Sequence, residues 1–321
     1  GAVYDVKVAA PGNVIASAGH DGTVRLWNNT VQGFSQVMRP HQEPVRAISL
    51  SPDGSLLLTG SHDQTMKLYS TLDRKFLFSL RGNNNRVLAC NFSPDTRLIA
   101  SGSDDRTVKL FDFASRQVIN TFCDHDAGIN SVQFHPDGTC VASGSQDKRI
   151  HIWDIRSQRL IQRYDAHSAE CNGIQFHPNG RYLLSSSKDS TLKIWDLRQG
   201  HILYTLYGHE GSSNAVGFSP CGDYFTTGGS DSVVMVWKSN LDENEQEFIE
   251  DFGAKSAPGQ NIPAVPQRKP TAGKKTRGAS AAKKGGASPT RSKFDASASQ
   301  MQGEAGAVGG LNEMPSYQPS G

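Results

Sequence analysis

Side chains that together could perform nucleophilic catalysis recur in this sequence at fixed distances. His125, Ser143 and Asp147 are the residue types of a hydrolytic triad, and Trp153 follows the aspartate six residues later. The same set returns twice, each time after the same interval. Its later copies are His167, Ser185, Asp189 and Trp195, and then His209, Thr227, Asp231 and Trp237. An enzyme needs one convergent site, whereas a structural device in a repeat recurs in every copy. The recurrence therefore favours a structural role, and no residue is predicted to be catalytic.

A fourth set has a changed last member. His41, Thr59 and Asp63 are followed by Tyr69, whose hydroxyl could donate a hydrogen bond in place of an indole. Buried polar groups are costly unless they are hydrogen-bonded. We therefore interpret each of the four sets as a structural device of its repeat.

The third repeat departs from this pattern at both ends of the set. Asn83 stands where the other repeats have histidine, and Phe111, which has no donor, stands where they have an aromatic donor. Ser101 and Asp105 then need other partners, which we expect in the loop at residues 81–87. We interpret the change as drift, with adaptation of this repeat to a partner as the alternative.

The elements that position these sets follow the same period. Aromatic residues recur at one constant interval over six copies with no insertion, at Trp27, Tyr69, Phe111, Trp153, Trp195 and Trp237. Turn residues such as "SPDG" at 51 divide each copy into about four short apolar strands. Alternation with no competing helical period predicts an all-β chain. A fixed period of about 42 residues is typical of a propeller or a solenoid.

Individual motifs favour the propeller. The "GH" at 208, the aspartate in each turn between the second and third strands, and the "WD" at 153 and 195 resemble the WD-repeat family. The resemblance covers residues 1–238 and implies a β-propeller in which each polar set is a hydrogen-bonded chain within one blade.

The last repeat is expected to be incomplete. After "VVMVWKS" comes "NLDENEQEFIED", which is too acidic to supply an apolar fourth strand. In WD-repeat proteins the amino terminus usually provides that strand, but here Gly1 is followed almost at once by a first strand. We expect a truncated start and seven blades in the intact protein. A six-bladed ring that closes imperfectly is the alternative.

The composition of the repeats indicates an intracellular protein. Residues 1–238 contain 23 Lys plus Arg and 22 Asp plus Glu, so their charge balance does not favour nucleic acid. The odd number of cysteines, without C-x-x-C pairs or a signal peptide, predicts reduced thiols and no metal site. No apolar run is long enough to span a bilayer. We expect a soluble cytoplasmic protein with no cofactor, no small-molecule substrate and no membrane partner.

The chain changes character after residue 238. Residues 239–252 form an acidic spacer, and residues 253–321 are a basic low-complexity tail that we expect to be disordered. The tail is either a solvated linker or an arm that binds a polyanion, such as acidic tubulin tails, nucleic acid or an anionic membrane. Without interleaved aromatics, base stacking is not favoured. The candidate binding residues are Lys269, Lys274, Lys275, Arg277, Lys283 and Lys284. Ser288, which precedes a proline, is a candidate phosphorylation site.

Particular stretches narrow the resemblance. "RKFLFSL" at 74, "LYTLYGHEG" at 203 and "GGSDSVVMVWKSNLD" at 228 are similar to the centriolar family called proteome of centriole protein one. In that third stretch Met235 and Lys238 replace the Lys and Asp of most blades. The resemblance implies a scaffold of the centriole or basal body that binds microtubule-wall and inner-scaffold proteins and supports cilium assembly. Members of that family typically carry a carboxy-terminal coiled coil, and no heptad pattern is present here.

A second class of function is kept as the alternative. "WDIR" at 153 and "WDLR" at 195 resemble the W-D-x-R motif of substrate receptors of cullin-RING ubiquitin ligases, in which the arginine contacts the adaptor. That resemblance would make Arg156 and Arg198 partner-binding residues, although arginine is common in such loops. The sequence therefore predicts a non-catalytic scaffold that presents rigid loops to protein partners.

Overall fold

The structure is a computed structural model that describes residues 1–9, 14–28 and 35–241. The repeats form one compact unit, Gly1–Asp242. Its boundary lies beyond residue 238, because Leu241 is buried against Tyr182, Phe225 and other residues of the last two sheets. The acidic spacer was predicted over residues 239–252, and its part from residue 242 onward lies outside the described residues. The basic tail, its candidate binding residues and Ser288 lie outside them as well.

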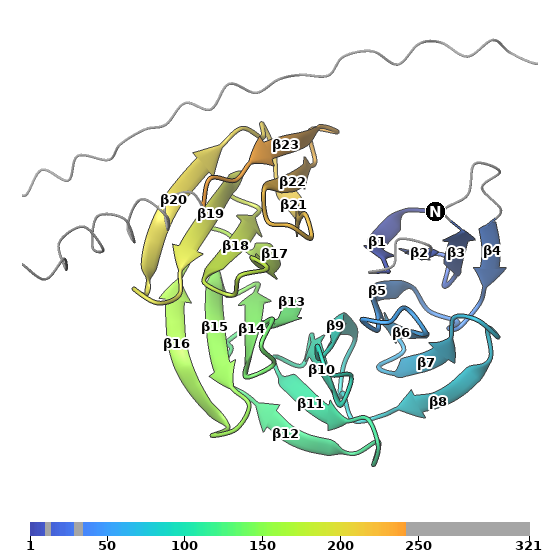
Figure 1. Ribbon diagram of the computed structural model, residues 1–321. Helices are drawn as coiled ribbons and strands as arrows, with labels where there is room; N and C mark the ends of the chain where they lie inside the picture. Colours follow the sequence, from blue (N-terminus) through green and yellow to red (C-terminus); the bar gives the residue numbers. More distant parts are fainter. Residues whose placement is uncertain (10–13, 29–34, 242–321) are drawn as a thin grey trace, which may run out of the picture. The chain divides into compact units, whose positions relative to one another are not determined.

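Every regular element in the described part of the chain is a β-strand, and the strands form six antiparallel sheets (Figure 1). The first three sheets contain β1 (Val3–Val8), β2 (Val14–Gly19), β3 (Val24–Asn28) and β4 (Ser35–Met38); β5 (Val45–Leu50), β6 (Leu56–Ser61), β7 (Met66–Ser70) and β8 (Phe76–Leu80); and β9 (Val87–Phe92), β10 (Leu98–Ser103), β11 (Val108–Asp112) and β12 (Val118–Phe122).

The second half of the unit repeats the arrangement. Its sheets contain β13 (Ile129–Phe134), β14 (Cys140–Ser145), β15 (Arg149–Asp154) and β16 (Arg159–Asp165); β17 (Cys171–Phe176), β18 (Tyr182–Ser187), β19 (Thr191–Asp196) and β20 (His201–Tyr207); and β21 (Ser213–Phe218), β22 (Tyr224–Gly229) and β23 (Val234–Lys238). Within the described residues the sixth sheet thus has three strands. The all-β propeller fold predicted from the repeats is confirmed. None of the described residues forms a helix long and apolar enough to cross a membrane.

Aspartate residues shape the turn between the second and third strands of each sheet. Asp63 Oδ1 accepts hydrogen bonds from the backbone N–H of Thr65 at 3.0 Å and from its hydroxyl at 2.7 Å. The residue between them, Gln64, has a φ of 68°, in the left-handed region. Such an Asx-turn reverses the chain in two residues, which explains why an aspartate occurs at this point in every repeat.

Neighbouring sheets pack face to face through apolar side chains. The second and third strands of one sheet contribute residues such as Leu58 and Met66, and the first strand of the next contributes Val87 and Cys90. The close approach requires small residues on the second strand. A Cβ at Gly102 would lie 2.7 Å from Ile129 Cγ2, so a larger residue there would push the fourth sheet away.

The same packing faces are uncovered at the two ends of the series. Val234 and Val236 of β23 are 73% and 68% exposed, whereas the residues at the same repeat positions in the other five sheets are at most 6% exposed. On the first sheet, Val3 and Val6 are 61% and 53% exposed, while Val45 and Ile48, at the same positions of the next repeat, are fully buried. Figure 1 shows the first and sixth sheets at opposite ends of an arc.

These faces generate a prediction about closure. A copy of residues 127–168 fused before Gly1 should raise the melting temperature by several degrees and reduce self-association. It would cover valines whose burial contributes about 1.5–3 kcal/mol each, and exposed sheet edges promote aggregation. The control is a Gly/Ser extension of equal length. A melting temperature no higher than that of the control would show that an added repeat does not complete the packing.

The sheets have two distinct ends. At one, which we call the connection end, the segments joining successive sheets lie beside the turns between second and third strands, as in the bond from Asp104 N to Arg86 O at 2.9 Å. At the other end, which we call the turn end, the turn between the first and second strands meets the turn between the third and fourth strands. An example is the bond from Ile155 N to Thr139 O at 3.0 Å. The polar sets contain the aspartates of the connection end.

Candidate interaction site and the repeated polar sets

The fourth sheet shows the complete polar set. Trp153 Nε1 donates to Ser143 Oγ at 2.8 Å, Ser143 Oγ lies 2.8 Å from His125 Nε2, and His125 Nδ1 lies 2.7 Å from Asp147 Oδ2. With the proton on Nδ1, each donor has one acceptor: the indole donates to the hydroxyl, the hydroxyl to the imidazole and the imidazole to the carboxylate. The four residues therefore form one directed hydrogen-bonded chain.

Two further sets have the same geometry. His167 Nδ1 lies 3.1 Å from Asp189 Oδ2, and Ser185 Oγ lies 2.9 Å from both His167 Nε2 and Trp195 Nε1. His209 Nδ1 lies 2.9 Å from Asp231 Oδ2, while Thr227 Oγ1 lies 2.9 Å from His209 Nε2 and 3.1 Å from Trp237 Nε1. The structure thus brings together all members of these predicted sets.

The second sheet has a shorter chain. His41 bonds to Asp63 Oδ2 at 2.6 Å and to Thr59 Oγ1 at 2.8 Å. Thr59 Oγ1 also lies 3.1 Å from the backbone oxygen of Lys67. The Tyr69 hydroxyl, predicted to replace the indole, has no hydrogen bond within the described residues, and its ring instead packs edge to face on Phe76 at 5.6 Å. A phenol lacks a donor at the position of the indole nitrogen, so Tyr69 does not join the chain.

In the third sheet, other groups take the places of the missing ends. Ser101 Oγ donates to Asn83 Oδ1 at 3.0 Å, and Asp105 accepts the backbone N–H of Asn84 at 2.9 Å. Lys109 Nζ lies 3.5 Å from Asp105 and also donates to the backbone oxygen of Gly82. Asn83 and Asn84 belong to the loop at residues 81–87, in which new partners were predicted, whereas the role of Lys109 was not predicted.

Burial removes these sets from nucleophilic chemistry. Ser143 and Ser185 are fully buried, and the hydroxyl of each is held between an indole and an imidazole. A nucleophile needs room for a substrate carbonyl near its oxygen. The described geometry offers no such room at either serine.

Each aspartate is stabilised in its charged form. Burial alone would raise the pKa of Asp147. The hydrogen bond from His125 and the electrostatic attraction of the same ring outweigh burial and lower the pKa to about 2. Burial opposes the hydrogen bonds from His41 and Thr65 in the same way at Asp63, whose pKa is also lowered to about 2. The carboxylates are therefore fixed hydrogen-bond acceptors at neutral pH and not proton-transfer groups.

His151 is a buried histidine outside the sets. Its ring stacks on that of His125, with centroids 3.9 Å apart, and neither ring nitrogen has a hydrogen-bond partner in the described chain. Burial, followed by repulsion from His125, lowers the pKa of His151 to about 4. Lys67, Lys109 and Met235 occupy its position in other repeats, so the histidine is not required by the fold.

Removal of one member of a set should destabilise the propeller. Asp147→Ala is expected to lower the free energy of unfolding by about 1–3 kcal/mol, because it leaves Nδ1 of the buried His125 without its acceptor. Trp195→Phe, which copies the natural Phe111, should cost on the order of 1 kcal/mol. Chemical denaturation measures both changes. Asp165→Ala, on a side chain 84% exposed, is the control and should change stability by less than about 0.5 kcal/mol. Equal stability of all three variants would contradict a structural role.

The buried His151 predicts loss of stability in acid. The unfolded chain takes up a proton at this residue near pH 6.5, whereas the folded chain does so only near the lowered pKa of about 4. The contribution of His151 to the free energy of unfolding is thus fully present above pH 6.5. It is lost as the pH falls towards 4, by up to about 1.4 kcal/mol per pH unit. His151→Met should reduce this slope in denaturation curves at pH 7.5 and 5. The exposed His201→Met is the control, and equal slopes for both variants would refute the assignment.

A second group of polar residues, which was not predicted from the sequence, links successive sheets. Asp5 Oδ2 accepts the backbone N–H of Ile48 at 3.0 Å, and Ser131 Oγ accepts that of Ile174 at 3.3 Å, in both cases 43 residues further along the chain. Gln175 Oε1 accepts the N–H of Phe218 at 2.6 Å in the same way. The sequence carried a signal at the position of Gln175, which is also polar in four other repeats, whereas the position of Asp5 and Ser131 is Ala or Gly in the remaining four repeats.

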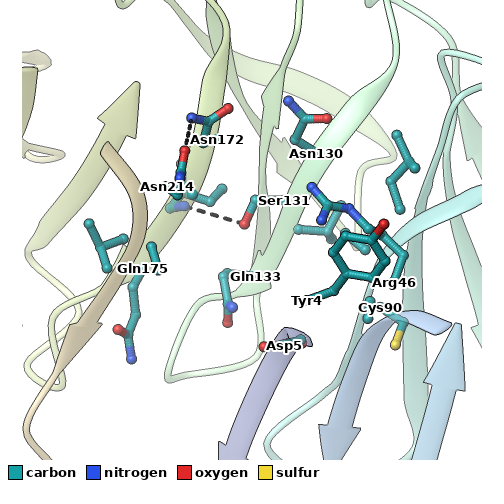
Figure 2. A pocket seen from close by; sticks show the side chains of 18 of the residues that line it. Tyr4, Asp5, Arg46, Cys90, Asn130, Ser131, Gln133, Asn172, Gln175 and Asn214 are labelled. Atoms are coloured by element: carbon teal, nitrogen blue, oxygen red, sulfur yellow. Dashed lines mark hydrogen bonds between the residues drawn. The ribbon is translucent and has the colours of Figure 1, made fainter. Parts of the chain in front are cut away.

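The first strands also line a central hollow of about 150 Å³ (Figure 2). Asn130 and Asn172 lie on its wall, and their side-chain amides donate to the backbone oxygens of Cys171 at 3.0 Å and Ser213 at 2.9 Å in the following sheets. Arg46 and Tyr4 face the hollow from the first two sheets. Amides and a guanidinium on rigid strands form a polar site that could bind a polar group of a partner.

The two arginines of the W-D-x-R motifs lie at the turn end. Asp154 Oδ1 accepts the backbone N–H of Arg156 at 2.8 Å, and Asp196 Oδ1 accepts that of Arg198 at 2.8 Å. The aspartates thus shape the turns, and both arginine side chains are exposed. The structure does not bring these arginines together with the polar sets, which contain the aspartates of the connection end.

Groups suited to metals or redox chemistry are not assembled in the described residues. They contain no cluster of three or more His, Cys, Asp or Glu side chains that could hold a metal ion. The five cysteines are free, and burial raises the pKa of the Cys90 and Cys171 thiols. Such thiols are poor nucleophiles at neutral pH.

Fold and repeats together define the chain as a WD-repeat β-propeller. A model described as WD domain, G-beta repeat matches residues 1–28, and a model described as Nucleolar protein 10-like, N-terminal domain matches residues 40–242. Because the second match covers more than half of the chain, the chain belongs to this family of nucleolar protein 10-like amino-terminal propellers. No match to a curated protein was found.

Proposed function

We propose that this propeller is a non-catalytic scaffold of the centriole or ciliary basal body that binds microtubule-wall and inner-scaffold proteins. A WD-repeat propeller fold indicates a protein-interaction scaffold, and one observation on this chain supports that role. The residues that could form a catalytic triad are instead buried in the same hydrogen-bonded chain in several sheets. The exposed loops and the central hollow are then the surfaces available for binding, and both suit protein partners.

The cellular location rests on a sequence resemblance. The last described strand, β23, carries the V-M-V-W-K stretch that resembles the centriolar family, with Met235 where three of the other five repeats have lysine. The proposal therefore includes a cytoplasmic, cytoskeletal location and tubulin or centriolar scaffold proteins as partners. The basic residues of 253–294 would add affinity for acidic tubulin tails by charge, and phosphate on Ser288 would reduce it.

One observation favours a second candidate function. Arg156 and Arg198 are exposed on neighbouring turns of the same end, each directly after a turn shaped by aspartate. Such arginines are available to an adaptor of a cullin-RING ubiquitin ligase. One observation weighs against the ligase function: the two Asp residues of these motifs form the local turns, so no partner is needed to explain them.

Imaging of the tagged full chain against a centriolar marker tests the first proposal. We expect signal at the centriole wall, weaker signal when residues 253–294 are removed, and unchanged signal for the Arg156→Gln, Arg198→Gln double variant. Affinity purification of the same proteins tests the second. Diffuse signal from the full chain would contradict the centriolar proposal, and recovery of a cullin adaptor that depends on both arginines would support the ligase function.

A further inference from the structure

Arg46 is the one charged residue at its position in the six repeats. The position is the second residue of each innermost strand, close to the connection end. The other occupants are Tyr4, Leu88, Asn130, Asn172 and Asn214. A charge at this position is therefore not needed to build the sheet, and Arg46 requires a separate explanation.

The guanidinium of Arg46 has no anionic partner in the described chain. It lies over the ring of Tyr4, 4.7 Å from the ring centroid, and the residue is half-buried (Figure 2). Asp5, which also lines the hollow, already accepts the backbone N–H of Ile48 at 3.0 Å and lies 4.0 Å from Lys7 Nζ. A partly desolvated cation without a hydrogen-bonded counter-ion is unfavourable, and stacking on an aromatic ring offsets only part of that cost.

His62 lies beside the connection that leads to Arg46, because its backbone N–H donates to the carbonyl of Pro44 at 3.0 Å. Burial is the main cause that lowers the pKa of His62, and the charges of Arg86 and Arg46 lower it further. Glu43 and Asp104 act in the opposite direction with smaller effect. Arg86 is exposed and lies in the connection into the third sheet. Two guanidinium groups thus flank the same region.

Asparagine side chains of the fourth, fifth and sixth sheets also line the hollow. Asn130 and Asn172 already use their amide hydrogens on backbone oxygens of the next sheet. Asn214 accepts bonds on Oδ1 from Asn172 and Ser212, but its own nitrogen donates to no group in the described part of the chain. The hollow therefore offers unused donors, at Arg46 and Asn214, and suits a ligand that brings acceptors.

Size and charge restrict that ligand. A hollow of about 150 Å³ is smaller than the roughly 300–1,000 Å³ of small-molecule sites, but it has room for one amino-acid side chain. The nearby Asp5, Glu43 and Asp104 disfavour a multiply charged group such as a polyphosphate. A single carboxylate on an extended segment meets both restrictions, since arginine binds carboxylates through two parallel hydrogen bonds.

We propose that the central hollow receives an acidic side chain of a partner polypeptide, whose carboxylate pairs with Arg46 while a neighbouring acidic residue of the segment pairs with Arg86. The inference rests on the proposed scaffold function and names the chemistry of its partner. It uses the connection end, so it is independent of Arg156 and Arg198 at the turn end.

Binding of a defined peptide tests the site. The probe is a fluorescent, blocked peptide of sequence Gly-Glu-Gly-Glu-Gly, measured by anisotropy with the full chain, and the control probe carries Gln in place of Glu. We expect saturable binding of the Glu peptide alone. Arg46→Gln should weaken it at least tenfold, with a smaller loss for Arg86→Gln. The affinity of Arg46→Lys should lie between those of the wild type and Arg46→Gln. Lysine keeps the charge but lacks the planar guanidinium that makes two parallel hydrogen bonds to a carboxylate.

The controls separate this site from general charge effects. Arg156→Gln removes the same charge at the turn end and should bind as the wild type does, and every variant keeps the same basic tail. If Arg46→Gln does not fold, the Arg46 side-chain N–H signal in a spectrum of the ¹⁵N-arginine-labelled wild type, assigned with Arg46→Lys, must still shift with the Glu peptide. Equal binding of both peptides, or of Arg46→Gln and wild type, would overturn the proposal. Neither result depends on centriolar localisation.

Discussion

The hydrogen-bonded histidine between two sheets is the interaction on which the rest of the propeller depends. His125 lies in the connection that follows the third sheet, and its two ring nitrogens reach Asp147 in a turn and Ser143 in a strand of the fourth sheet. The connection is thereby fixed to the sheet that follows it. Because the same bonds recur at the same positions of other repeats, those sheets are placed relative to the previous one by the same geometry, and the first strands meet around one hollow.

That constraint explains why the functional surface is elsewhere. Groups committed to buried bonds cannot bind a substrate, so the residues that vary between repeats while the fold stays constant are the informative ones. Arg46, Asn130 and Asn214 share one position on the innermost strands, yet they use their polar groups differently. A fixed frame with variable side chains at one end suits recognition of a polypeptide segment, and the same reasoning applies to Arg156 and Arg198 at the other end.

Much of this arrangement followed from the sequence, and the failures have physical causes. The constant repeat period predicted the strands and the sets, because a histidine, a hydroxyl, an aspartate and a tryptophan at constant spacing satisfy one another's donors and acceptors. Tyr69 was misjudged, since a hydroxyl on a ring edge does not reach the place of an indole nitrogen. Lys109 and Arg46 were missed because their roles depend on which strands lie side by side in the third dimension. The centriolar assignment remains a prediction from short stretches.

Hydrogen exchange of the indole protons tests the central claim most directly. In the full chain at neutral pH, the Nε1–H groups of Trp153 and Trp195 should exchange only through large-scale unfolding, because each donates to a fully buried serine. Their protection should match that of the slowest backbone amides in the same sheets. Exchange of these two indole protons within seconds, while the backbone amides of β15 and β19 stay protected, would show that the chains are not formed and would contradict the account.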